Sequence, residues 1–159
     1  MPPRPEPPEL LPFNGDWRAF EGMLWTIFQR DVIRADLRYD NRSVNARRMP
    51  ETNRRWASFW HLVSEGPVED ERTPDLDRCA RLPWVRWVIE NADTHPDIHV
   101  WRNRRRGETN ILMWYAERYL VVVSDRRDYL LLKTAYCTTR SRRIQTLRRE
   151  RDEWHAQNG

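Results

Sequence analysis

Four residues of this chain are of types that can act on a phosphate ester, namely His61, Thr134, Tyr136 and Arg140. Histidine is the side chain whose unperturbed pKa lies nearest neutrality, so His61 can serve as a general acid or base. Thr134 and Tyr136 are two positions apart in an apolar run, and on a regular strand they share one face. Arg140 follows at the start of a predicted helix, where free backbone N–H groups add to its positive charge. These types, brought together, can bind a phosphate and move protons during its cleavage.

His61 is the first candidate for the acid or base because it is followed by Glu65. On a helix, a carboxylate four residues further on is close enough to orient the imidazole ring. The alternative for His61 is structural, since its neighbours Trp60 and Leu62 are bulky and apolar. It would then be a buried histidine that is hydrogen-bonded to the backbone, with Glu65 a solvated acid at the helix end.

Thr134 and Tyr136 are candidates because the strand that carries them changes in character. With regular alternation, Leu130 and Leu132 precede them on the same face of the strand. That face then changes from core residues to residues of a site or of the sheet rim. Tyr136 can stack on a base, and Thr134 can hydrogen-bond a phosphate or a 2′-hydroxyl. Lys133 then points to the other side, as a surface or helix-facing charge rather than a catalytic one. The alternative is ordinary strand composition, because Thr and Tyr both have high β-propensity.

Clusters of arginine provide a wider surface for anions. The guanidinium group matches phosphate bidentately and stacks on bases. Each cluster alone is most often a solvated face, but three of them in one small domain favour a nucleic-acid contact. The predicted RNA-binding residues are Arg78, Arg81, His99, Trp101 (as a stacking platform), Arg102, Arg104, Arg105, Arg142 and Arg143.

The composition agrees with an anionic partner but does not require one. The chain has 159 residues, 28 basic and 24 acidic, for a formal net charge of +4. Lys133 is the only lysine, so the remaining basic residues are arginines. A GC-rich genome would also explain this bias, because its codons favour arginine.

Several classes of site and location are not expected. Cys79 and Cys137 form no CxxC or Cys/His pattern, and two reduced thiols in a cytoplasmic protein are the better interpretation. We expect no metal and no cofactor, because there is no glycine-rich phosphate loop, no HExxH and no spaced carboxylate cluster. No apolar run approaches the ~18 residues that span a bilayer, so no membrane contact is expected.

The pattern of apolar residues predicts an α+β fold in which N-terminal helices pack on a four-stranded antiparallel meander sheet, followed by a C-terminal basic helix. Residues 1–13 form a Pro-rich extended tail, and residues 14–157 form a single domain. Helices are expected at 17–34, at 75–91 with an interruption at Pro83, and at 139–157. Residues 36–48 are a loop or an edge strand. Strands are expected at 98–101, 111–115, 119–123 and 129–136, with the helices gathered on one face of the sheet.

The late strand reading LLLKTAYC, with a four-stranded sheet before it and a basic helix after it, resembles the barnase–EndoU–colicin–RelE-like nuclease fold. The closest likeness is to small phage-associated and toxin-like members, whose final strand carries a Thr-Ala-Tyr type of signature. Thr134 and Tyr136 match that signature, and the resemblance covers roughly residues 98–151. It implies a metal-independent ribonuclease that is held in check by an antitoxin or immunity protein.

The expected function is therefore an endoribonuclease of bacterial or prophage origin, toxin-like and cytoplasmic, which leaves 2′,3′-cyclic phosphate and 5′-hydroxyl ends. Its expected partners are RNA and an acidic inhibitor. Two alternatives remain open. One is an RNA-binding or ribosome-associated module without catalysis, and the other is a phage or host protein-interaction protein.

Overall fold

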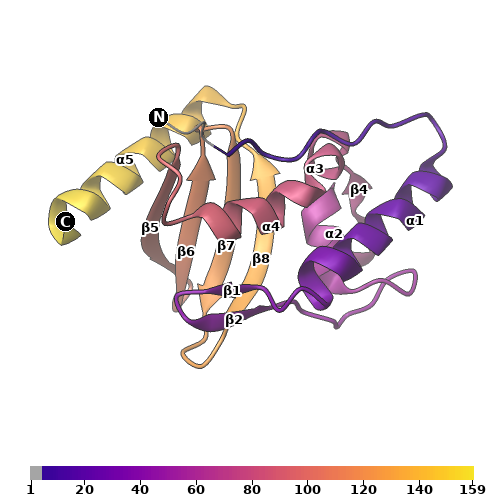
Figure 1. Cartoon of the computed structure of the whole chain (residues 1–159), viewed down its shortest axis with the longest axis horizontal. Coiled ribbons are helices and arrows are strands. Elements are labelled where there is room, and N and C mark those ends of the chain that lie inside the picture. The colour runs from indigo at the N-terminus through magenta and orange to yellow at the C-terminus, as the bar shows by residue number, and fades with distance from the viewer. Residues whose placement is uncertain (1–4) are drawn as a thin grey trace.

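A computed structural model describes residues 5–159 and shows an α+β architecture (Figure 1). Within these residues, helices flank a curled sheet of six strands. The helices are α1 (Trp17–Phe28), α2 (Ala57–Val63), α3 (Leu76–Ala80), α4 (Leu82–Asn91) and α5 (Ser141–Asn158), with a π-helical turn η1 (Gln29–Ile33) and a 3-10 turn η2 (Glu69–Glu71). The strands are β1 (Arg38–Tyr39), β2 (Arg42–Asn45), β3 (Ser64–Glu65), β4 (Thr73–Pro74), β5 (Ile98–Arg105), β6 (Glu108–Tyr115), β7 (Tyr119–Asp125) and β8 (Leu130–Cys137).

The predicted helices form for local reasons that the sequence contains. The Asp16 carboxylate accepts a hydrogen bond from the Ala19 N–H at 3.1 Å and so caps α1. Helix α1 continues directly into η1, and the two elements together correspond to the helix predicted at 17–34. The helix predicted at 75–91 is two helices, and Pro83 lies in the first turn of α4, where its missing N–H costs nothing.

The predicted antiparallel meander is present as β5–β8, but it is only part of the sheet. The strand order is β1-β2-β8-β7-β6-β5, and β2 pairs in parallel with β8. The sheet is therefore mixed and six-stranded, and the prediction of four antiparallel strands is wrong in this detail. The parallel contact is short, with Val44 opposite Leu130 and Asn45 opposite Leu131, so the apolar pattern of β2 could not specify its partner.

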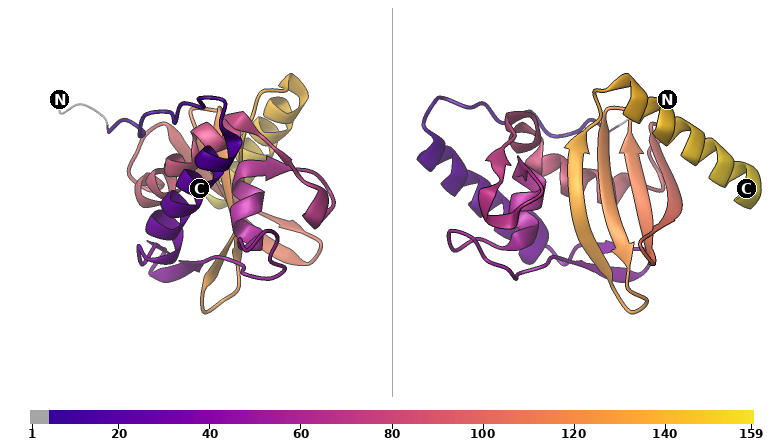
Figure 2. Two further views of the ribbon diagram at one scale, coloured as in Figure 1. Left: turned by 90° about the vertical axis from the view of Figure 1, so that its right-hand side faces the viewer. Right: turned by 180° about the vertical axis from the view of Figure 1, so that it is seen from behind.

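Helices cover both faces of the sheet, which corrects the expectation that they gather on one. Helices α1, α2 and α4 pack on the first face, where Phe28, Phe59 and Met113 belong to the larger core. Helix α5 packs on the second face, where Leu147 contacts the smaller core. That smaller core is formed by Trp101, Leu112, Trp114, Leu120 and Leu147. Figure 2 shows α5 running from the top of the sheet toward its β5 edge.

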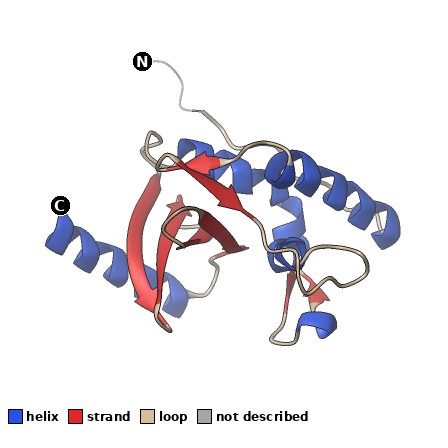
Figure 3. Ribbon diagram, turned by 90° about the horizontal axis from the view of Figure 1, so that it is seen from below, coloured by secondary structure: helices blue, strands red, loops and turns tan. Residues whose placement is uncertain are grey.

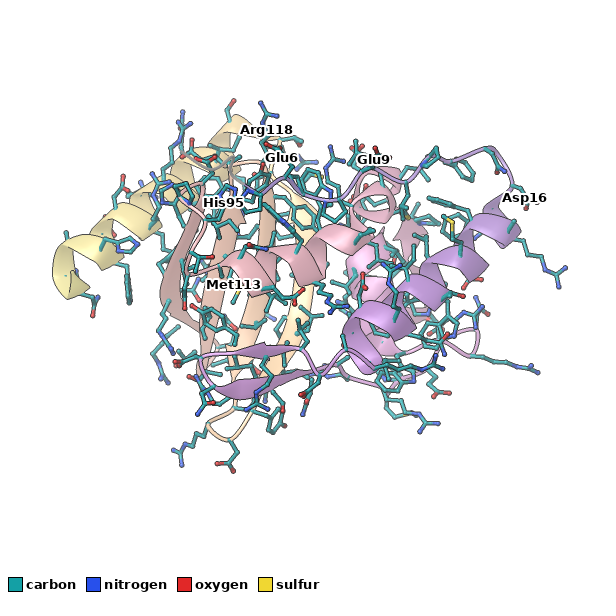
Figure 4. All side chains as sticks on the ribbon, viewed as in Figure 1. Glu6, Glu9, Asp16, His95, Met113 and Arg118 are labelled. Atoms are coloured by element: carbon teal, nitrogen blue, oxygen red, sulfur yellow. The ribbon has the colours of Figure 1, made fainter. Side chains whose placement is uncertain are left out.

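The sheet curls, as the view from below shows (Figure 3). The described part of the N-terminal tail, residues 5–16, contains no helix or strand and runs along α3 and α4. Three hydrogen bonds hold it there: Leu11 N–H to the Ala80 carbonyl at 3.0 Å, Trp84 Nε1 to the Pro8 carbonyl at 2.7 Å, and His95 Nε2 to the Pro5 carbonyl at 3.0 Å. His95, labelled in Figure 4, is therefore buried beneath the tail.

Candidate functional site

A β-bulge at Lys133 decides which side chains of β8 face which way. Val122 pairs with Thr134, whereas the next residue of β7, Val123, pairs with Leu132. Lys133 is thus the extra residue, and the bulge resets the alternation of side chains along the strand. Lys133 Nζ lies 3.3 Å from Glu108 Oε2 on β6.

The bulge separates residues that regular alternation would place together. Leu130 and Leu132 lie in the larger core on the first face of the sheet. Tyr136 packs instead against the smaller core, beneath α5. The prediction that the two leucines share a face with Thr134 and Tyr136 is therefore wrong, because one inserted residue moves the two sets to opposite faces.

Tyr136 is the centre of a cluster of guanidinium groups. Its hydroxyl accepts hydrogen bonds from Arg143 Nε at 3.1 Å and Nη2 at 2.7 Å. The Arg78 guanidinium lies over the tyrosine ring, 5.5 Å from its centroid. Arg140 lines the same pocket, whose volume is about 310 Å³. We call Arg78, Tyr136, Arg140 and Arg143 the Tyr136 site.

Arg78 is fixed in this site by the backbone around it. It lies on α3, and its Nη1 donates to the carbonyls of His61 at 3.0 Å and Ser64 at 2.8 Å. These carbonyls belong to the C-terminal end of α2 and the residue that follows, where helices leave acceptors unsatisfied. Asp75 Oδ2 lies 3.3 Å from Arg78 Nε. Arg78 thus joins α2, α3 and β8, and its charge is partly balanced.

The start of α5 carries arginines whose charge is not balanced by a neighbouring carboxylate. Within residues 5–159, Arg140, Arg142 and Arg143 form no ion pair with a carboxylate. By contrast, two predicted RNA-binding arginines are neutralised, Arg102 by Asp125 at 3.0 Å and Arg105 by Glu150 at 3.1 Å. Helix N-termini also present free N–H groups, so this turn is the strongest anion-attracting part of the pocket. The same pocket includes the carboxylates of Glu65, Asp75 and Asp77, which lower its net charge.

The main chain of His61 contacts the Tyr136 site, since its carbonyl accepts a hydrogen bond from Arg78. Thr134 Oγ1 donates to the His61 carbonyl at 3.2 Å. The His61 ring hydrogen-bonds through Nε2 to Glu69 Oε1 at 2.8 Å, and its side chain is 30% exposed. Glu69, rather than Glu65, is therefore the carboxylate that orients this ring. Arg47, His61 and Lys133 line a small hollow of about 60 Å³ at this edge of β8.

Trp101 does not offer a stacking surface. Its ring is fully buried beneath α5, and its Nε1 donates to Glu150 Oε1 at 2.9 Å. The expectation that it forms a platform for bases is wrong, because α5 covers this face of the sheet. Arg104 lies on the same strand and donates to Thr109 Oγ1 at 3.1 Å.

Of the remaining predicted residues, His99 lies on another strand than Tyr136, whereas Arg81 pairs at 3.9 Å with Asp77, which lines the same pocket as Tyr136. His99 is largely exposed on β5, and partial desolvation of its ring, with a contribution from the charge of Arg151, holds the pKa of His99 below its ordinary value. Strands β5 and β8 are three strand spacings apart, roughly 14 Å. Arg81 stacks over Trp84 on α4, with 5.2 Å between the guanidinium and the ring centroid.

Sequence reasoning missed Glu69, Arg47, Glu108 and Arg126, which contact or surround the predicted residues. None of them lies in an apolar pattern. Arg126 Nη2 donates to Glu108 Oε1 at 2.9 Å, a contact between the turn after β7 and the start of β6. The pairing of β6 with β7 brings Glu108 close to Arg126, whereas Glu69 reaches His61 from η2.

The described residues contain no group of three or more His, Cys, Asp or Glu side chains arranged to hold a metal ion. Nor does any helix within residues 5–159 combine the length and the apolar character needed to cross a bilayer. No family model, curated protein or solved structure matches this chain.

Proposed function

We propose that this protein is a metal-independent endoribonuclease that binds RNA phosphate at the Tyr136 site and transfers protons through His61. The observation that carries the proposal is the meeting of Arg78, Arg143 and the first turn of α5 around the Tyr136 ring and hydroxyl. Fixed cations at a phosphate stabilise the charge that develops in the transition state. An aromatic ring among them suits a base of single-stranded RNA.

The proposed reaction needs no atoms beyond those of the RNA. The 2′-oxygen attacks the adjacent phosphorus, the bond from phosphorus to the 5′-oxygen breaks, and a 2′,3′-cyclic phosphate forms. One proton leaves the 2′-hydroxyl, and one reaches the departing 5′-oxygen. His61 is the candidate for one of these transfers, because Glu69 orients its ring and 30% of its side chain is accessible. Thr134 Oγ1 can accept a further hydrogen bond from a 2′-hydroxyl while it donates to the His61 carbonyl.

The proposal includes an acidic inhibitor and a cytoplasmic, toxin-like setting in a bacterium or prophage. An acidic partner would be steered to Arg140, Arg142 and Arg143, which are not neutralised within the described residues. Cys79 and Cys137 are free thiols, which is typical of a reducing compartment.

The test is incubation of total bacterial RNA with the purified chain in EDTA, followed by end-group mapping of the fragments. We expect discrete cuts with cyclic phosphate and 5′-hydroxyl ends. His61→Ala, Thr134→Ala and Arg143→Ala should each lower the cleavage rate at least ~100-fold with the fold retained. Arg149→Ala is the matched control, because Arg149 is an exposed arginine of the same helix outside the Tyr136 site.

Each outcome of this experiment has a distinct meaning. Wild-type rates in the His61 and Thr134 variants would remove those residues from the reaction. RNA that stays intact but shifts on a gel at low salt would mean that the protein binds RNA without cleaving it. Neither cleavage nor binding would overturn the RNA proposal and favour a protein-interaction function.

A further inference from the structure

A second group of cations surrounds the carboxylate of Glu108, and one of them, Lys133, lies on the same strand as Tyr136. Lys133 Nζ is 3.3 Å from one oxygen of Glu108, and Arg126 Nη2 is 2.9 Å from the other. Each oxygen is therefore held by a different cation, as the oxygens of a bound phosphate are held. The three side chains are accessible, with 35% of Glu108 and 31% each of Lys133 and Arg126 exposed.

The charges around Glu108 leave a positive excess. Hydrogen bonding to Lys133, with further contributions from the charges of Arg126 and Arg47, holds the pKa of Glu108 below its ordinary value. One carboxylate thus contacts two cations, Lys133 and Arg126, and Arg47 lines a small hollow together with Lys133. The nearby Asp125 does not offset them, because Arg42 at 2.7 Å and Arg102 at 3.0 Å already engage it.

The surroundings of this cluster also contain hydrogen-bonding capacity that the protein does not use. Glu108 and Arg126 line an open pocket of about 410 Å³ at the hairpin end of the sheet, together with Arg104 and Ser124. Arg126 Nε and Ser124 Oγ are buried without a hydrogen-bond partner within residues 5–159. Buried polar groups are normally satisfied, so unsatisfied ones at a pocket call for an explanation such as a ligand.

We propose that Lys133, Arg126 and Arg47 form a second phosphate subsite, which the Glu108 carboxylate fills in the free protein and an RNA phosphate takes over on binding. This inference rests on the proposed function and extends it to the length of RNA that the protein contacts. Lys133 and Tyr136 are three residues apart on β8, roughly 10 Å. The two subsites are therefore placed to hold successive phosphates of one extended strand, and the substrate is an oligonucleotide strand rather than a mononucleotide.

Glu108 acts as an internal competitor for RNA in this arrangement, so removal of its charge should strengthen binding. The probe is a short fluorescein-labelled 2′-O-methyl oligonucleotide of mixed sequence, which has no 2′-hydroxyl to attack. Its affinity is measured by fluorescence anisotropy in EDTA over a range of salt concentrations. Glu108→Gln should tighten binding by roughly threefold to fivefold.

The matched control is Glu90→Gln, which makes the same change in net charge on α4, where Glu90 pairs with Arg86 on the other side of the sheet. It should leave the affinity within about twofold of wild type. Lys133→Met and Arg126→Met should each weaken binding and reduce the slope of log K against log salt concentration by about 0.7. Lys133→Arg should retain the wild-type slope, which separates loss of charge from disturbance of the bulge, and thermal unfolding of each variant checks the fold.

The outcomes distinguish this inference from the proposed function. Equal effects of Glu108→Gln and Glu90→Gln, or an unchanged slope in folded Lys133→Met, would overturn the second subsite, even where ordinary RNA is still cleaved. If the variants bind the probe as expected but the protein does not cleave ordinary RNA, the second subsite is supported and the proposed ribonuclease activity is overturned. Failure of both wild type and Glu108→Gln to bind the probe would overturn both.

Discussion

The two arginines at Tyr136 differ in how much of the fold depends on them. Arg78 is 13% exposed and donates to the carbonyls of His61 and Ser64, so its removal would take one hydrogen bond from each of these acceptors, which Thr134 and Arg72 also contact. Arg143 has only the Tyr136 hydroxyl as a hydrogen-bond acceptor within the described residues. Loss of Arg143 therefore tests phosphate binding, whereas loss of Arg78 would combine binding with stability.

A second residue-scale expectation concerns Asp125, which joins β7 to the β1–β2 hairpin. Hydrogen bonds from Arg42 at 2.7 Å, from the Arg127 N–H at 2.9 Å and from Arg102 at 3.0 Å hold the pKa of Asp125 well below its usual range. A carboxyl whose pKa is lower in the folded than in the unfolded state stabilises the fold above its unfolded-state pKa of about 3.9. That stabilisation is lost as the pH falls through the folded-state pKa.

We expect Asp125→Asn to lower the free energy of unfolding at pH 7 by about 1–3 kcal/mol, because Arg42 loses a charged partner. The variant should also lose less stability than wild type as the pH falls below about 4. Urea unfolding at pH 7 and at a series of acidic pH values measures both effects. Asp128→Asn, in the same turn, is the control, and parallel pH profiles for wild type and Asp125→Asn would contradict the assignment.

At the scale of elements, α5 carries part of the candidate site and has a single fully buried residue. Leu147 is the residue of α5 that is fully buried, and Glu150 accepts hydrogen bonds from Trp101 at 2.9 Å and Asn103 at 2.8 Å. The rest of the helix is largely polar and exposed. The position of Arg143 therefore depends on a few contacts that lie further along the same helix.

Leu147→Ala should lower the free energy of unfolding by about 2–5 kcal/mol, because it leaves a cavity between α5 and the tryptophans of the smaller core. RNA binding should weaken in parallel as the first turn of α5 loosens. The exposed Arg149→Ala should change stability by less than about 0.5 kcal/mol. Urea unfolding compares the two variants, and a Leu147→Ala protein as stable as Arg149→Ala would show that α5 does not depend on this anchor.

The strands show which features the alternation of apolar residues can predict and which it cannot. Alternation of apolar residues predicted β5–β8 and their order, since each strand is long enough to display its buried face. It could not predict the bulge at Lys133, because an inserted residue leaves no trace in composition. One expectation failed for this reason, namely that Leu132 shares a face with Tyr136.

On the scale of the whole molecule, two apolar cores lie on opposite faces of one sheet, and the strands of that sheet contribute residues to both. Met113 on β6 contributes to the larger core, and its neighbours Leu112 and Trp114 contribute to the smaller one. Because the same strands supply residues to both cores, unfolding of the sheet would expose both cores at once. The folded unit should therefore unfold cooperatively.

We expect a single unfolding transition that is the same by tryptophan fluorescence and by far-ultraviolet circular dichroism. Tryptophans report on both faces, with Trp101 and Trp114 beneath α5 and Trp25 and Trp56 against the larger core. Urea titration followed by both signals is the measurement. Two separated transitions would mean that α5 and the second face form an independent unit.

The sequence by itself determined the α+β class, the four long strands, the C-terminal basic helix and the abundance of arginine, because each of these is encoded in local composition or periodicity. The tertiary structure alone decided which face α5 covers, which strand β2 joins and which arginines are neutralised. Arg105 and Glu150, for example, lie 45 positions apart in the chain. Periodicity records that a face is buried but not what buries it, and ion pairs between distant residues leave no pattern that could reveal which cations stay free for a ligand.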